Sequence, residues 1–170
     1  MDILLQGEID FMKGLIKKIE GFYKIILLVL TLAMFIIVGT NVFSRYVLNN
    51  SLGWADELAR FIFIWVSFLG AVLAYAHNEH IGLDFIIDKL PSEKIKLAFR
   101  LISDLGILLV LSFLAYYGWT VAIAATNVSP ALYIPMKIIY MVIPVSAVLM
   151  VLINISKFIQ HAAQLKNELK

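Results

Sequence analysis

The chain has 170 residues, of which 62% are apolar and only 15% are charged, with a mean hydropathy of +0.92 and a net charge of +2. In a soluble domain about a quarter of the residues are charged, so this composition indicates a membrane protein. The small net charge gives no argument for nucleic acid binding. The absence of cysteine excludes a disulfide framework, an iron–sulfur site and a thiolate nucleophile.

The chain begins with a leader, residues 1–21, in which apolar residues recur at helical spacing between charged ones. Two interpretations are open. The leader can be an amphipathic segment that lies on the cytoplasmic leaflet, or a cytoplasmic extension of the helix that follows. A cleaved signal peptide is not expected, because the leader contains Asp and Glu and the next apolar run is too long.

Four apolar runs come after this leader, and each predicts a transmembrane helix. They cover about residues 22–44, 58–77, 101–125 and 136–156. About 18–22 residues at 1.5 Å rise cross a hydrocarbon core of roughly 30 Å. A chain this small could not surround four apolar helices with protein. The sequence therefore predicts one all-α domain over residues 1–170, an integral membrane bundle of four transmembrane helices.

The basic residues predict the orientation of this bundle. Eleven of the 14 Lys and Arg residues lie in the leader or the first turn of the first helix, between the second and third helices, or after the fourth helix. The other three are Arg45, Arg60 and Lys137. The positive-inside rule then places both termini and the middle loop in the cytoplasm. The opposite face would be periplasmic in a bacterium, with membrane lipid around the helices.

The middle of each predicted helix lacks Asp, Glu, Lys, Arg and His. A transporter that binds ions by itself needs such groups near the membrane centre. No nucleophile–base pair, Gly-rich phosphate loop or paired catalytic carboxylate is visible, so the chain is not expected to be an enzyme.

Polar side chains gather instead around the connection between the first two helices. The candidates there are Arg45, Tyr46, Trp54, Asp56, Glu57 and Arg60. Asp56 and Glu57 lie four and three residues before Arg60, so either acid can pair with it on one helix face. One interpretation is a capped helix hairpin with aromatic anchors at the membrane boundary. The other is a docking site for a partner at the periplasmic side.

Three further sets of residues are candidates for simpler roles. Arg100 and Asp104, four apart, predict a structural ion pair at the start of the third helix. A set of small residues on the second helix allows close packing against another helix; it comprises Ser67, Gly70, Ala71 and Ala74. Acids and histidines just after the second helix have metal-like spacing, but loop histidines are usually solvated, so no metal or haem site is expected; they are His77, Glu79, His80 and Asp84.

The order and spacing of several stretches resemble the small membrane subunit of TRAP (tripartite ATP-independent periplasmic) transporters. These stretches are 41–49, 54–60, 65–71, 80–84 and 129–135, with Tyr140 and Pro144 after them. One departure is Asp56-Glu57, where the family often has Glu-Glu. The resemblance covers nearly all of the chain from the first to the fourth helix.

The resemblance implies a scaffold role in the bacterial inner membrane. A large permease subunit would hold the sodium and substrate sites, so no cofactor is expected in this chain. A periplasmic binding protein would deliver an organic acid of the C4-dicarboxylate or sialic acid type, and a sodium gradient would drive import. The alternatives are a small membrane cytochrome or electron-transfer subunit, and an independent small exporter, which the missing midplane carboxylate argues against.

Overall fold

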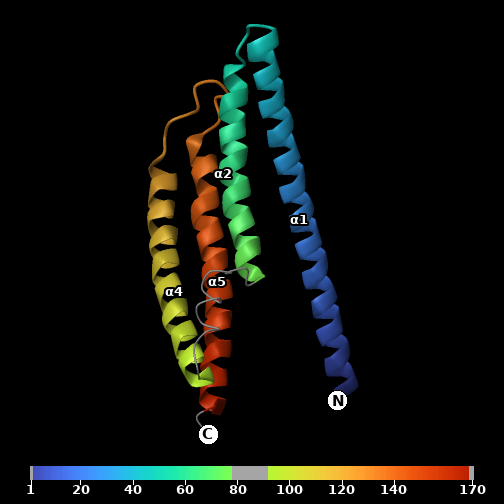
Figure 1. The fold of residues 1–170 in the computed structure, drawn as a ribbon, viewed down its shortest axis with the longest axis vertical. Coiled ribbons are helices and arrows are strands. Elements are labelled where there is room, and N and C mark those ends of the chain that lie inside the picture. The colour runs from blue at the N-terminus through green and yellow to red at the C-terminus, as the bar shows by residue number, and fades with distance from the viewer. Residues whose placement is uncertain (1, 78–91, 169–170) are drawn as a thin grey trace. The chain divides into compact units, whose positions relative to one another are not determined.

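The structure, a computed structural model, describes residues 2–77 and 92–168. Those ranges contain the helices α1 (Asp2–Val47), α2 (Gly53–Ala76), α4 (Glu93–Ala124) and α5 (Met136–Glu168) (Figure 1). All four are long and apolar enough to cross a membrane. An isolated bridge between Val128 and Pro135 is the only extended pairing in the described residues. The predicted all-α class with four membrane helices is confirmed, while the direction in which they cross stays a prediction.

The helices extend beyond the apolar runs that predicted them. α1 begins at Asp2, so the leader and the first span form one continuous helix. α4 begins at Glu93, and α5 continues to Glu168. Hydropathy marks only the part of a helix inside the hydrocarbon, whereas the backbone hydrogen bonds of a helix can continue into water. The expected boundaries therefore locate the membrane part of each helix rather than its ends.

The chain divides into two compact units, residues 1–66 and 67–170, which are described separately. The first unit contains the hairpin in which α1 leads into α2. The Ser44 carbonyl accepts hydrogen bonds from the Leu48 and Asn50 amides, and the Ser44 hydroxyl donates to the Asn50 carbonyl at 2.7 Å. Asn49 has φ 50°, a left-handed conformation that asparagine tolerates better than most residues. These contacts define the turn that joins the two helices.

The second unit contains the last turns of α2 together with α4 and α5, of which α4 and α5 lie side by side (Figure 1). At Gly118, α4 approaches α5 so closely that a larger side chain would have little space. A Cβ built there would lie 3.1 Å from Ile143 Cγ2 and 3.2 Å from Pro144 Cδ. Pro144 lies inside α5. Gly118 therefore gives α4 the space to pass the proline of its neighbour.

The loop between α4 and α5 is organised around Ser129, which is fully buried. The Ser129 amide donates to the Ile134 carbonyl at 2.9 Å, and the Ile134 amide donates back to the Ser129 hydroxyl at 3.3 Å. The Tyr133 amide donates to the Ser129 carbonyl at 3.1 Å, and Tyr133 adopts φ 56°. One serine thus satisfies the backbone of a loop whose sequence contains no charged residue.

Candidate functional site

The end of α1 and the start of α2 are connected by the side chain of Asn41, which is buried. Its amide nitrogen donates to Asp56 Oδ1 at 2.6 Å, and its amide oxygen accepts from the Leu52 backbone amide at 3.0 Å. Leu52 precedes α2 and Asp56 lies in its first turn, so Asn41 bonds both the residue before the second helix and the start of that helix. The two ends of the asparagine amide are both used.

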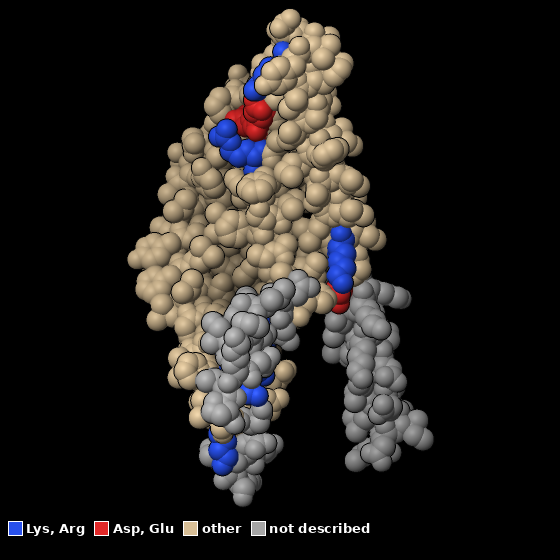
Figure 2. Space-filling view, in the orientation of Figure 1, with Lys and Arg blue, Asp and Glu red and all other residues tan. Residues whose placement is uncertain are grey.

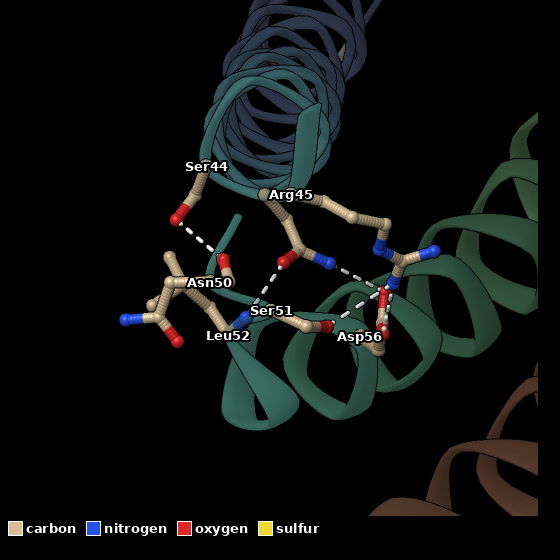
Figure 3. Close-up of polar contacts among 7 residues, drawn as sticks. Ser44, Arg45, Asn50, Ser51, Leu52 and Asp56 are labelled. Atoms are coloured by element: carbon tan, nitrogen blue, oxygen red, sulfur yellow. Dashed lines mark hydrogen bonds and ion pairs between the residues drawn. The ribbon is translucent and has the colours of Figure 1, made fainter. Parts of the chain in front are cut away.

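Arg45 makes a second connection, one helical turn after Asn41. Its Nη2 lies 3.0 Å from Asp56 Oδ2 and 3.4 Å from the Ser51 hydroxyl (Figure 3). The side chains of Arg45 and Asp56 are 50% and 54% exposed. An exposed ion pair in water contributes about 0–1 kcal/mol, so this pair orients the hairpin more than it stabilises it.

Stability measurements should separate these two connections. We expect Asn41→Ala to destabilise the isolated subunit by about 2–3 kcal/mol, because it leaves the Leu52 amide without its acceptor and removes a hydrogen bond to a carboxylate. Arg45→Gln should cost about 0–1 kcal/mol, since the pair that it breaks is exposed. Thermal unfolding in detergent measures both. Equal losses in the two variants would contradict this ranking.

The contacts of Asp56 correct one expectation from spacing. Both of its carboxylate oxygens face α1, where they meet Asn41 and Arg45, and no ion pair joins Asp56 to Arg60 in the described residues. The reason is geometric: a residue in the first turn of α2 faces the end of α1 across the short connection, whereas Arg60 lies one turn further along. Arg60 is exposed.

Asp104, which spacing predicted to pair with Arg100, has a partner on another helix. Its Oδ2 lies 2.7 Å from His161 Nδ1 of α5. The side chains of Asp104 and His161 are 8% and 22% exposed. Packing of α4 against α5 brings the histidine to the carboxylate, which the spacing along α4 alone could not show. Arg100 lies on the same helix, in its third turn.

A further polar contact in the second unit joins α5 to the end of α2. Asn154 donates to the Tyr75 hydroxyl, and the Lys157 ammonium donates to the Tyr75 carbonyl. That ammonium also lies 4.1 Å from the centroid of the Tyr75 ring. A cation is favourable at the carboxyl end of a helix, where carbonyls lack partners. Sequence reasoning missed these residues, although the spacing of Asn154, Lys157 and His161 on one face of α5 was a usable signal.

The remaining candidates lie on α1 and α2. Tyr46 is exposed on the last turn of α1, and Trp54 is exposed at the start of α2, as interfacial aromatic anchors require. Glu57 follows Asp56 in α2 and is partly exposed. The small residues Ser67, Gly70, Ala71 and Ala74 also lie on α2, and a Cβ built at Gly70 would meet no atom within 4 Å.

Of the residues considered for metal binding, His77 is described and the others are not. His77 Nδ1 lies 2.9 Å from the Leu73 carbonyl, one turn earlier in the chain. Glu79, His80 and Asp84 lie outside the described residues.

Charged side chains lie outside the long apolar stretch of each described helix. On the face shown in Figure 2, blue and red atoms gather in a few groups, and most of the surface between these groups is tan. The apolar stretches 25–44, 61–76, 105–124 and 138–156 contain no Asp, Glu, Lys, Arg or His. An ion that crosses a membrane needs polar ligands at this depth. These stretches therefore supply no charged or imidazole side chain as an ion ligand.

Comparison with known proteins gives a consistent result. Residues 34–164 match the family described as "Tripartite ATP-independent periplasmic transporters, DctQ component". A TRAP transporter small permease protein of Haemophilus influenzae is 28% identical over 87% of this chain and 92% of its own length. The ectoine TRAP transporter small permease protein TeaB of Halomonas elongata is 32% identical over 82% of this chain and 72% of its own length. The sialic acid TRAP transporter permease protein SiaT of H. influenzae is 29% identical over 71% of this chain, but that match spans only 20% of SiaT.

Proposed function

The chain belongs to the DctQ family of small membrane subunits of TRAP transporters, and on this premise we propose that it supports a large permease subunit during sodium-driven import of an organic acid. It is a multi-pass protein of the bacterial inner membrane and a transporter component, not an enzyme. A member of a tripartite transporter works with other subunits. The observation that carries the scaffold role is the absence of Asp, Glu, Lys, Arg and His from all four apolar stretches.

The division of work follows from that absence. The large permease holds the sodium and substrate sites, since this chain offers no ligands for either at the required depth. A periplasmic binding protein delivers the substrate. The substrate class is an organic acid of the C4-dicarboxylate or sialic acid type, an assignment supported by relatives that are named for sialic acid and for C4-dicarboxylate transport.

Reconstitution tests this function directly. The small subunit, its large permease and its binding protein are purified, and uptake of labelled sialic acid or succinate into liposomes is measured under an inward sodium gradient. We expect uptake with the complete set, and loss of uptake when the small subunit is omitted or the sodium gradient is abolished. Uptake that persists without the small subunit would contradict the scaffold role. Uptake by the small subunit alone would favour the independent exporter instead.

The hairpin between α1 and α2 is the part of the chain that we propose to support the periplasmic face of the complex. Arg45 and Asp56 are matched to each other, so their charges hold the hairpin in one conformation. The exposed aromatic residues Tyr46 and Trp54 flank this pair at the proposed membrane boundary. A hairpin of fixed geometry offers a stable surface to the other subunits.

Charge reversal of this ion pair should lower uptake without preventing insertion. We expect Arg45→Asp or Asp56→Arg to reduce uptake several-fold, because two like charges then lie about 3 Å apart in place of the ion pair. The double variant Arg45→Asp/Asp56→Arg should recover most of the uptake, since it restores opposite charges. Membrane insertion, measured by fractionation, serves as the control. If the double variant recovers neither uptake nor stability, the proposal that this ion pair holds the hairpin in one conformation is contradicted.

A further inference from the structure

One face of α2 is exposed along most of its length. Between Arg60 and Ala74 the exposed residues fall three or four positions apart, which places them on a single stripe of the helix. They are Arg60, Phe63, Ser67, Ala71 and Ala74. Buried residues of the same helix, such as Phe61 and Val72, fall outside this stripe. We call this set of five residues the α2 stripe.

The α2 stripe differs in chemistry from the exposed faces of the neighbouring helices. α1 exposes large apolar side chains such as Phe35 and Ile36, and α4 exposes side chains such as Leu109 and Phe113. Long apolar side chains of this kind suit contact with lipid tails. In the α2 stripe the only large apolar side chain is Phe63, and Ser67, Ala71 and Ala74 are small. Small residues allow a second membrane helix to approach closely, which lipid contact does not require.

Arg60 adds a charge to this stripe. It is exposed, and in the described residues no carboxylate forms an ion pair with it, because Asp56 is occupied by Asn41 and Arg45. It lies seven residues after the start of α2, about 10 Å along the helix axis, and is followed by an apolar run. A charged side chain at such a position is costly unless a counter-charge or a water-filled region meets it.

We propose that the α2 stripe is the surface on which the large permease packs, with Arg60 paired to a carboxylate on a permease helix near the proposed periplasmic boundary. This inference rests on the proposed function and names the partner's contact within it. Charge complementarity selects an acidic partner, and the small residues select a closely packed helix over lipid. SiaT supports the choice of partner, because there the matching segment is one fifth of a longer permease chain.

Photo-crosslinking in intact membranes tests the position of the surface. The full small subunit is co-expressed with its large permease, and p-benzoyl-phenylalanine replaces either Phe63 on the α2 stripe or Phe113 on α4. These two phenylalanines are 59% and 55% exposed, so they form a matched pair. We expect the Phe63 probe to give an adduct with the combined mass of the two subunits, and the Phe113 probe to give none. Adducts of the Phe63 probe with lipid, or with α1 of the same chain, would overturn the proposal.

Neutralisation of the charge tests the ion pair. Arg60→Gln should lower the amount of large permease that co-purifies with a tagged small subunit at least tenfold, while Arg60→Lys should retain more than Arg60→Gln. Lys137→Gln is the matched control, since Lys137 is also an exposed basic residue near the start of a helix but lies on α5, outside the α2 stripe. The melting temperature of the isolated Arg60→Gln subunit should equal that of the wild type.

Two results would count against different claims. Wild-type recovery of the permease by Arg60→Gln overturns the ion pair that we propose for Arg60, while leaving the scaffold role intact. If the wild-type subunit recovers no large permease at all, the proposed function itself fails.

Gly70→Leu gives an independent check of close packing beside the α2 stripe, because the added side chain meets no atom of the described residues within 4 Å at its Cβ. Undiminished recovery with this variant would also contradict the surface.

Discussion

Gly118→Val should destabilise the isolated subunit by about 2–3 kcal/mol, through overpacking between α4 and α5. The Cβ alone would lie 3.1 Å from Ile143 Cγ2, 3.2 Å from Pro144 Cδ and 3.4 Å from Pro144 N. The isoleucine methyl can move, but the proline ring is part of the backbone of α5 and cannot turn away. Gly118→Ala should cost less, about 1 kcal/mol, since only the Cβ must be accommodated. Thermal unfolding in detergent measures both losses.

Gly106 supplies the control for this prediction. It lies on the same helix, and a Cβ built there would meet no atom within 4 Å. Gly106→Val therefore introduces the same β-branched residue into α4 without the contact to α5. We expect the Gly106 variant to unfold within a few degrees of the wild type. Comparable destabilisation by both valines would show that the effect comes from the helix itself and not from the approach of Pro144.

His161→Ala should produce a loss of stability of about 3 kcal/mol or more. The histidine is the partner of Asp104, whose side chain is 8% exposed, and the two atoms lie 2.7 Å apart. Removal of one member of a buried pair leaves the other without compensation, which typically costs about 3–5 kcal/mol. The same change should loosen α5 from α4, so hydrogen exchange of the amides near Asp104 should also accelerate.

A double variant distinguishes the buried charge from the loss of packing. Asp104→Leu/His161→Leu removes both polar groups and replaces them with apolar side chains, so it should be more stable than His161→Ala. His161→Gln should lie between the wild type and His161→Ala, because a glutamine amide can still donate to the carboxylate. If the double leucine variant is as unstable as His161→Ala, the contribution of His161 is packing and not compensation of Asp104.

The polar residues show where prediction from sequence ends. Asp56 and Asp104 each have an arginine four residues away, and spacing predicted those pairs. Each carboxylate contacts a residue of another helix, Arg45 for Asp56 and His161 for Asp104. Spacing identifies only the partners available on the same helix. A partner on a different helix depends on the turn that joins them or on the packing between them, as at the α4–α5 contact.

Asn41 and Lys157 make contacts that the sequence did not predict. Asn41 stood in the polar stretch around Arg45, yet nothing in its position indicated that its amide would bond both Leu52 and Asp56. Lys157 counted only as one of the cytoplasmic positive charges in the sequence. In the structure it lies over the ring of Tyr75 and bonds the carbonyl of that residue. These roles require the chain to be folded before they exist.

Sequence alone was sufficient for the all-α class, the four membrane helices and the resemblance to TRAP small subunits. Hydropathy is the sum of local side-chain properties, and a run of about twenty apolar residues has few other stable environments. Only the tertiary structure decided which polar groups meet, where α4 and α5 can approach, and which face of α2 is left with Arg60 and small side chains. Those features depend on distances between helices, and the order of residues along one helix does not contain them.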